Sequence, residues 1–189
     1  MDNTLPPFQS FAGQFMIAAQ NEAGQFFDKS VVLITKHSQN EGAEGYIINQ
    51  PMTLAPSEIF KKRDIAYLGS DFHLMRGGPV DMDHGAVLHS DDYRALDTKP
   101  LMNKLAITET QQALDDIADH AGPKYFLVLV GKAVWAPGQL EEEIMGNMWI
   151  PAPYSFDIIF NTPDNKKWQE ALATLKIDAN LLTNQAGKA

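Results

Sequence analysis

The stretch YFLVLVGKAVWAPGQLEEEIMGNMW, residues 125–149, decides the fold of this chain. Its first part, Tyr125–Val130, is a continuous apolar run that is too short for an independent helix. Such a run is typical of a β-strand that is covered on both faces. The next part, Gly131–Gly138, ends in Pro137-Gly138 and is predicted to be a loop that turns the chain.

A helix is predicted directly after this loop, over Gln139–Met148. Leu140 and Ile144 are four residues apart and fall on one helix face, which would turn toward the core. Glu141 and Glu142 occupy the first turn, where negative charge suits the helix dipole. A buried strand, a shaped loop and a helix N-terminus therefore meet in one place, which is a common geometry for a binding site.

Further strands and helices are predicted on both sides of this stretch, from apolar runs and from breaks at glycine and proline. We expect strands at 13–19, 31–37, 45–49, 73–76, 85–89, 105–108 and 157–161, and helices at 56–63, at 108–121 and from 162–164 onward. The short separation between the strands 31–37 and 45–49 predicts an antiparallel hairpin. Hairpins early in the chain and helix-separated strands later predict an α+β fold with a mixed, largely antiparallel sheet.

The helix at 108–121 has the clearest predicted boundaries. Thr108 and Gln111 have the spacing of a capping box, which places the start of the helix at Thr108. Gly122-Pro123 would end it. We find no internal repeat and no long linker, so we expect one domain over residues 1–189 with loose tails at 1–12 and 183–189.

The composition is that of an acidic chain without cysteine. The chain has 189 residues, a formal net charge of -9 and no cysteine, and its pI is about 4.9. The absence of cysteine excludes disulfides, cysteine zinc sites and thiol nucleophiles. The negative charge disfavours direct binding of nucleic acid, because nucleic-acid binders usually carry a basic face.

The basic residues form two clusters, Lys61-Lys62-Arg63 and Lys166-Lys167, which we expect on solvated faces of helices. The N-terminus lacks the charged and apolar regions of a signal peptide. No apolar stretch reaches the roughly 20 residues of a membrane span. We therefore expect a soluble, cytoplasmic protein without membrane contact.

Standard catalytic and nucleotide-binding motifs are absent from the sequence. Asp115-Asp116-x-x-Asp119 is similar to an Mg²⁺-diphosphate motif, but the apolar residues around it predict a solvated helix face. Asp81-x-Asp83-His84, with His89 downstream, could supply metal ligands, but a turn with acidic caps is the simpler interpretation. We expect no metal and no cofactor.

Two histidines lie at the ends of predicted strands. His37 and His89 could form an acid–base pair if the two strand ends converge. The alternative is that each ring bonds a nearby backbone carbonyl, and we favour it because most buried polar groups are satisfied in this way.

A binding surface is predicted where glycine bends and polar side chains coincide. The Gly77-Gly78-Pro79 bend offers backbone N–H groups that can cradle an anion, and Trp135 could be partly exposed in its loop. We expect one cleft over the end of the strand that begins at Tyr125. Its candidate binding residues are Asn49, Pro51, Gly77, Gly78, Pro79, Trp135, Gly138, Gln139, Glu141 and His37.

Several blocks of sequence occur in a recognisable order: DKSVVLI at 28–34 with His37, GAEGYIINQP at 42–51, GGPV at 77–80, Gly85 with Leu88-His89, GKAVW at 131–135, GQLEEEI at 138–144, and Trp149. Together they resemble the AlgH/YqgE family of bacterial proteins, from about Gly13 to about Leu175. The chain departs from the family's usual pattern at Lys132, where an uncharged residue is more usual. It also departs at Val134, where the family has glycine, and at Glu44, where it has an apolar residue.

This resemblance implies a bifurcated, partly barrel-like sheet surrounded by helices, in a bacterial cytosolic protein. The family name comes from a regulatory role in alginate production, and the resemblance implies no catalytic mechanism. We therefore favour a non-enzymatic regulatory or binding protein whose ligand or partner is open. The alternative is a hydrolase or transferase that uses His37 or His89 with an acidic partner. A DNA-binding regulator is a third possibility that the acidic charge and the lack of a helix-turn-helix pattern disfavour.

Overall fold

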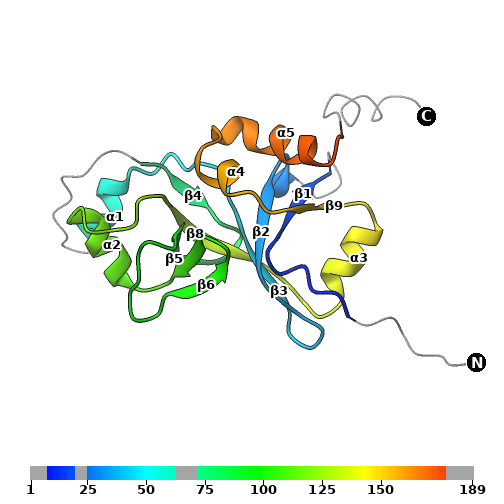
Figure 1. Ribbon diagram of the computed structural model, residues 1–189, viewed down its shortest axis with the longest axis horizontal. Helices are drawn as coiled ribbons and strands as arrows, with labels where there is room; N and C mark the ends of the chain where they lie inside the picture. Colours follow the sequence, from blue (N-terminus) through cyan, green and yellow to red (C-terminus); the bar gives the residue numbers. More distant parts are fainter. Residues whose placement is uncertain (1–7, 20–24, 63–71, 178–189) are drawn as a thin grey trace, which may run out of the picture.

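The computed structural model describes residues 8–19, 25–62 and 72–177 of the chain (Figure 1). The strands are β1 (Gln14–Ala18), β2 (Val31–Ser38), β3 (Gly42–Ile47), β4 (Leu74–Arg76), β5 (Val80–Ser90), β6 (Lys99–Met102), β7 (Leu105–Thr108), β8 (Phe126–Trp135) and β9 (Trp149–Pro153). The helices are the 3-10 turn η1 (Gln25–Phe27), α1 (Pro56–Lys62), α2 (Gln111–Ala118), α3 (Gln139–Met145), α4 (Phe156–Phe160) and α5 (Asp164–Thr174).

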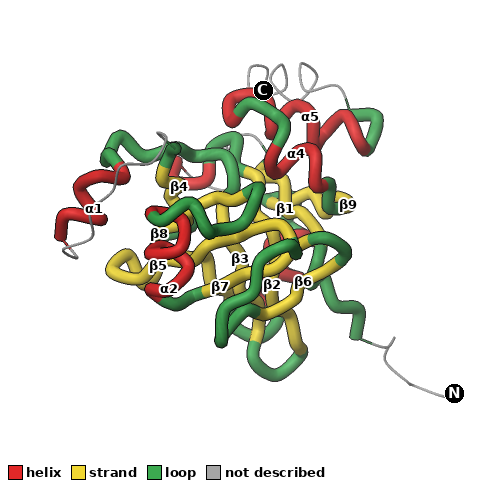
Figure 2. Tube along the Cα trace, turned by 60° about the vertical axis from the view of Figure 1, so that its left-hand side comes forward, coloured by secondary structure: helices red, strands yellow, loops and turns green. Residues whose placement is uncertain are grey.

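The strands form one curled sheet with the shape of a half-barrel, which Figure 2 shows from a second direction. Within the described residues the strand order is β6-β7-β5-β8-β3-β2-β1-β9, and β4 pairs with β8 off this path. The β4–β8 pairing is parallel, and the other strand pairings are antiparallel. The predicted α+β class, the hairpin of β2 with β3 and the mixed, largely antiparallel, bifurcated sheet are confirmed.

Strand β8 belongs to both halves of the sheet. Its first part, Phe126–Val130, pairs with β5 and β4, and its last part, Ala133–Trp135, pairs with β3. Gly131 lies between the two parts with a φ of 70°, a conformation that residues with a Cβ rarely adopt. The predicted loop over Gly131–Gly138 is therefore wrong in its first five residues. A glycine inside a strand pattern can mark a bend rather than an end.

Close backbone packing holds the two halves together at Gly131. A Cβ on Gly77 would lie 2.2 Å from the carbonyl oxygen of Gly131, and a Cβ on Gly78 would lie 2.0 Å from the carbonyl carbon of Lys132. The N–H of Gly77 donates to a carbonyl of β8 at 2.7 Å, and its carbonyl accepts from an N–H of β3 at 2.8 Å. The segment after β4 thus links β8 to β3, and only glycine fits there. We call Gly77, Gly78 and Gly131 the glycine crossing.

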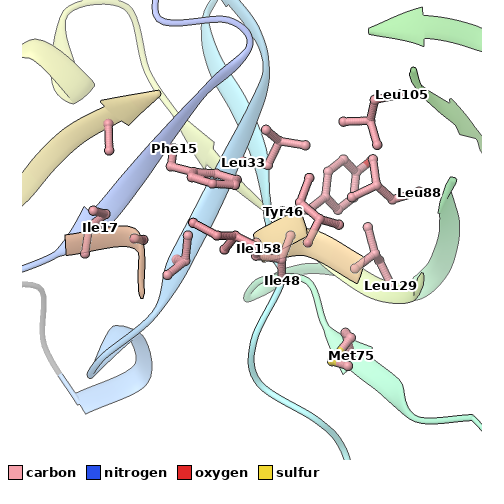
Figure 3. Close-up of a cluster of buried hydrophobic side chains, with 14 of the residues drawn as sticks. Phe15, Ile17, Leu33, Tyr46, Ile48, Met75, Leu88, Leu105, Leu129 and Ile158 are labelled. Carbon is pink, nitrogen blue, oxygen red and sulfur yellow. The ribbon is translucent and has the colours of Figure 1, made fainter. Parts of the chain in front are cut away.

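The helices cover the sheet by packing on three apolar clusters. Figure 3 shows the largest cluster, in which Tyr46 and Leu129 lie inside the half-barrel and Ile158 of α4 packs from one side. Leu140 of α3 joins a second cluster, and Leu114 of α2 joins a third. In Figure 1, α1 and α2 lie at one side of the sheet, α3 lies at the other, and α4 and α5 lie together along a third edge. None of the helices among the described residues is long and apolar enough to cross a bilayer.

Helix α5 carries a buried lysine. Lys167 is 1% exposed, and its Nζ donates to the carbonyl of Ile48 at 2.9 Å and pairs with Asp164 at 2.8 Å. Burial lowers the pKa of Lys167, against the opposing effect of Asp164. The expected solvated position is therefore wrong for Lys167, although Lys166 and Lys61 are exposed. Arg63 lies outside the described residues.

Two predicted elements have the wrong type or start. The predicted strand at 157–161 is instead the helix α4 with its C-cap Asn161, and the Ser155 hydroxyl caps the start of the helix by accepting from the N–H of Ile158. A short apolar run does not distinguish strand from helix by itself. The helix predicted from Thr108 begins at Gln111, because Thr108 is the last residue of β7 and pairs with Val87. The capping box is therefore wrong.

The edges of the sheet and the end of α3 also differ from prediction. The edge strands β6 and β9 were not predicted. Both contain proline, which reads as a strand breaker but is tolerated at an edge because it has no N–H to donate. Helix α3 ends at Met145, with Gly146 as its C-cap, rather than at Met148.

Candidate functional site

A cavity of about 250 Å³ lies where β8 passes from one half of the sheet to the other. Strands β3, β5 and β8 and the segment after β7 all contribute to its walls. We call it the split cavity. Its lining residues are Tyr46, Asp81, His84, Gly85, Ala86, Glu109, Gly131 and Lys132.

One wall of the split cavity is an irregular segment of β5. Val80 pairs with Lys132, but the next pairing joins Gly85 to Val130, so residues 81–84 leave the ladder as a bulge. Asp81 within the bulge has a φ of 54°, which is a strained conformation for a residue with a side chain. Bulges and strained residues of this kind are frequent beside functional sites, because they aim side chains away from the regular sheet.

Tyr46 places a neutral hydroxyl at the cavity. Its residue is 4% exposed, and its hydroxyl donates to Glu109 Oε1 at 3.4 Å. Burial raises the pKa of the phenol well above its ordinary value, and the nearby carboxylates of Glu44, Glu109 and Asp81 raise it further. The hydroxyl therefore remains protonated at physiological pH and can donate or accept a hydrogen bond.

Lys132 is held between two carboxylates. Its Nζ lies 2.9 Å from Glu44 Oε2 and 3.3 Å from Asp81 Oδ2. Glu44 also pairs with Lys36 at 2.8 Å. Burial alone would raise the pKa of Glu44, but the hydrogen bonds and positive charges of Lys36 and Lys132 lower it overall. Glu44 and Lys132, two of the positions where the chain departs from the AlgH/YqgE pattern, thus form one ion pair.

The facing wall carries a second ion pair. Glu109 Oε2 accepts from Lys99 Nζ at 2.6 Å, and this bond raises the pKa of Lys99. Asp97 fixes the turn between β7 and α2 by accepting from the N–H of Glu109 at 2.9 Å and from the hydroxyl of Thr110 at 2.8 Å. A smaller cavity of about 170 Å³ shares His84, Gly85, Ala86 and Glu109 and continues toward the start of α2.

Several of the residues predicted for the cleft lie instead at the start of α3 and in the side-chain cluster that it covers. Trp135 is 3% exposed, so its expected exposure is wrong. Its indole N–H donates to Glu143 Oε2 at 2.8 Å, and Trp149 donates to the same oxygen at 2.7 Å. Gln139 donates to the other oxygen of Glu143 at 2.8 Å. Gly138, with a φ of 81°, is the N-cap of α3. We call Trp135, Trp149, Gln139 and Glu143 the indole cluster.

His37 and Glu141 lie next to the indole cluster. The Nε2 atom of His37 lies 3.1 Å from Glu141 Oε1, and its Nδ1 accepts from the N–H of Phe11 at 2.9 Å. Because Nδ1 is an acceptor, the proton of the neutral ring lies on Nε2 and points at Glu141. Both ring nitrogens are therefore engaged.

The remaining predicted residues lie along β2, β4 and the glycine crossing. The side chain of Asn49 accepts from the N–H of Val31 and donates to the carbonyl of Lys29, each at 2.8 Å, so it fixes the start of β2. Pro51 bridges to Met75 of β4. Gly77 and Gly78 are buried in the crossing, and Pro79 is exposed. None of the ten predicted binding residues is among those that line the split cavity.

The two strand-end histidines lie far apart in the sheet. His89 pairs with Phe126 at the start of β8, whereas His37 pairs with Ala43, which in turn pairs with Trp135 at the end of β8. The ring of His89 bonds the carbonyl of Ser90 at 2.8 Å and the hydroxyl of Thr108 at 2.9 Å. Burial lowers the pKa of His89. The carbonyl-bonded alternative therefore holds for His89.

The two acidic motifs do not form ligand sets within the described part of the chain. No group of three or more His, Cys, Asp or Glu side chains in residues 8–19, 25–62 and 72–177 is placed to hold a metal ion. Asp116 accepts from the hydroxyl of Tyr93 at 2.5 Å, and Asp81 pairs with Lys132.

Sequence reasoning missed the residues that define the split cavity. Tyr46 reads as part of an apolar strand, and Glu109 reads as the start of a helix. The unusual charges of Glu44 and Lys132 were a usable signal, because two compensating charges at unusual positions indicate contact. Nothing in the sequence indicates that Glu109 lies at the same cavity as Glu44 and Lys132. Glu109 contacts Tyr46, which is 63 positions earlier in the chain.

Comparisons with known proteins show that the chain is similar to one family of bacterial proteins. The AlgH-like family model matches residues 15–180. A UPF0301 protein of Thioalkalivibrio sulfidiphilus is 36% identical over 95% of this chain and 97% of its own length, and one of Rhodopseudomonas palustris is 38% identical over 94% and 88%. The solution structure of the AlgH protein of Pseudomonas aeruginosa matches with a TM-score of 0.77 and 31% identity, over 100% of both chains.

Proposed function

This chain belongs to the AlgH-like family, and we propose that it is a non-enzymatic binding protein, with a regulatory role, that takes up a small ligand or a group of a partner in the split cavity. The observation that carries this proposal is the cavity of about 250 Å³ with charged side chains of both signs and a neutral hydroxyl on its walls. Concave sites with a few converging polar groups are the usual form of small-ligand sites.

The two strand-end histidines, His37 and His89, are not placed to act on a molecule in the split cavity. A general base needs a ring nitrogen that can reach the proton of a substrate. Both ring nitrogens of His37 and of His89 already have partners, and neither residue lines the split cavity. The contact of His37 with Glu141 at 3.1 Å is of the kind that the hydrolase or transferase alternative requires, but neither residue lines the split cavity.

We further propose that the protein acts in the cytoplasm without contacting DNA directly. The net charge of -9 supports the absence of DNA contact, because the phosphate backbone of DNA repels an acidic surface. A gel shift with duplex DNA at low salt should show no retarded band. A salt-sensitive complex would contradict this part of the proposal.

The central experiment is a titration of isotope-labelled protein followed by amide chemical shifts. The probes are four classes of small polar molecules, namely simple amines, carboxylates, amino acids and sugars. We expect at least one class to shift the amides of Tyr46, Gly85 and Gly131 in a saturable way, and the probe to be recovered unchanged. If no class shifts these amides, or if the probe is converted to product, the proposed function is wrong.

A further inference from the structure

The ion-paired charges around the split cavity balance each other. Three carboxylates, those of Glu44, Asp81 and Glu109, act on the phenol of Tyr46. Three ammonium groups pair with them at 2.6–3.3 Å, and these belong to Lys36, Lys99 and Lys132. The formal charge of this set is zero. A ligand with one net charge would therefore leave one charge of the set uncompensated, whereas a ligand that carries both charges would not.

The ion pairs stand on two different walls of the cavity, and each wall carries charges of both signs. Lys132 stands on the β8 wall, where Glu44 and Asp81 hold it. Glu109 stands on the wall that follows β7, where Lys99 and the hydroxyl of Tyr46 contact it. A molecule in the cavity can thus present a carboxylate to Lys132 and an ammonium group to Glu109 at the same time.

These ion pairs can exchange partners with a ligand. The side chains of Lys99 and Asp81 are 51% and 50% exposed, whereas those of Glu109, Lys132 and Glu44 are 35%, 26% and 15% exposed. Exposed pairs contribute little to stability, because water already solvates both charges. Replacing Lys99 or Asp81, the two exposed partners, by a charged group of a ligand therefore has a small penalty. The exchange would be far less favourable for a fully buried pair.

Resting on the proposed function, we infer that the ligand of the split cavity is a small zwitterion of the α-amino acid class. Its carboxylate binds Lys132, its ammonium group binds Glu109, and the hydroxyl of Tyr46 bonds whichever group lies nearer. The volume of about 250 Å³ is below the 300–1,000 Å³ that is usual for drug-sized ligands, which matches a molecule of this size.

The test compares three probes that share one side chain and differ only in charge. L-leucine carries both charges, L-leucinamide carries only the positive charge, and N-acetyl-L-leucine carries only the negative charge. We expect L-leucine to bind at least tenfold more tightly than either of the others, as measured by amide shifts or by calorimetry. Equal or tighter binding of L-leucinamide would overturn the inference in favour of a cation site, and equal or tighter binding of N-acetyl-L-leucine would overturn it in favour of an anion site.

Variants locate the two charges. Glu109→Gln and Lys132→Met should each weaken the binding of L-leucine at least tenfold. Glu109→Gln should also reduce the preference for L-leucine over N-acetyl-L-leucine, which lacks the ammonium group. Lys132→Met should reduce the preference for L-leucine over L-leucinamide, which lacks the carboxylate. Glu142→Gln is the matched control, because Glu142 is exposed on α3 and does not line the cavity. Unchanged binding in Glu109→Gln and Lys132→Met would overturn the inference, as would the absence of binding of all three probes by the unaltered protein.

The zwitterion inference can fail while the proposed binding function holds. If amines, carboxylates or sugars shift the amides of the cavity while the amino acids do not, the cavity is a binding site and the zwitterion inference fails. If no probe of any class shifts them, both fail. The comparison of the three leucine probes uses the unaltered protein, so it does not depend on whether a variant folds.

Discussion

The last part of β8 separates two polar regions that lie on its opposite faces. Ala133 and Trp135 point into the apolar cluster under α3, where Glu143 accepts two indole N–H groups. Lys132 and Val134 alternate with them, and Lys132 reaches the split cavity. Both regions contain a carboxylate with several donors. In the indole cluster the two indole donors are neutral and buried, whereas around the split cavity the lysine donors are charged and partly exposed to water.

This difference separates a structural use of a carboxylate from a binding use. A carboxylate that accepts from buried N–H groups cannot be released without leaving those groups unsatisfied. A carboxylate paired with an exposed lysine can change partners with little loss. The indole cluster therefore serves stability, and the split cavity is free to exchange partners. Three predictions test this comparison.

The largest effect is expected for the backbone of β8 itself. Gly78→Ala would place a Cβ 2.0 Å from the carbonyl carbon of Lys132, so β8 would have to move and both faces would be disturbed. We expect the free energy of unfolding to fall by about 3 kcal/mol or more, as measured by urea denaturation. The matched control is Gly85→Ala, whose Cβ would meet its nearest atom at 3.3 Å, with an expected change below about 1 kcal/mol. Similar losses in both variants would show that the glycine crossing is not tightly packed.

The indole cluster is expected to give an intermediate effect. Glu143→Ala leaves the indole N–H groups of Trp135 and Trp149 without their acceptor. Each unsatisfied buried donor destabilises a protein by about 1–3 kcal/mol, so we expect the two donors together to cause a loss of at least about 2 kcal/mol. Urea denaturation followed by tryptophan fluorescence measures it. Glu142→Ala, on the exposed side of the same helix turn, should change stability by less than about 0.5 kcal/mol. Equal effects at the two positions would contradict the structural role of Glu143.

The ion pairs of Glu44 beside the split cavity are expected to give the smallest effect on stability, and this effect should depend on pH. The pKa of Glu44 is lowered in the folded protein, so its ionised form stabilises the fold above the ordinary value of 4.5, and this contribution is lost as the pH falls. Because the paired lysines are partly exposed, we expect Glu44→Gln to lower the free energy of unfolding by no more than about 1 kcal/mol at neutral pH. The difference between the two proteins should close as the pH falls well below 4.5. A difference that persists in acid would show that Glu44 acts through packing rather than charge.

Local sequence patterns predicted most of the strands, but not that β8 belongs to two halves of the sheet. The apolar runs in β1, β2, β7 and the first part of β8 were recognised because each is bounded by turn residues. The sequence predicts that the strand ends at Gly131, because glycine is common both at a bend within a strand and at the start of a loop. Only the contact of Gly77 and Gly78 with β8 distinguishes them, and that contact joins positions about fifty residues apart in the sequence.

The candidate site was harder to predict than the fold. The ten residues chosen from the sequence are polar or conformationally special, and several have structural roles: Asn49 fixes the start of β2, and Trp135 bonds Glu143. The split cavity depends instead on Tyr46, Glu109 and Lys132, which come from three separate elements. No local pattern brings these elements together, because the long-range strand pairing of the half-barrel does so.

Helix α5 has a consequence for the order in which the chain folds during synthesis. Trp168 donates its indole N–H to the carbonyl of Ala18, 150 positions earlier, and Lys167 reaches the carbonyl of Ile48, 119 positions earlier. A ribosome delivers α5 after the strands β1 to β9, so these two carbonyls lack their side-chain donors until α5 has been made. A nascent chain that stalls before Asp164 would thus hold an unfinished core, and would be a target for chaperones rather than a folded intermediate.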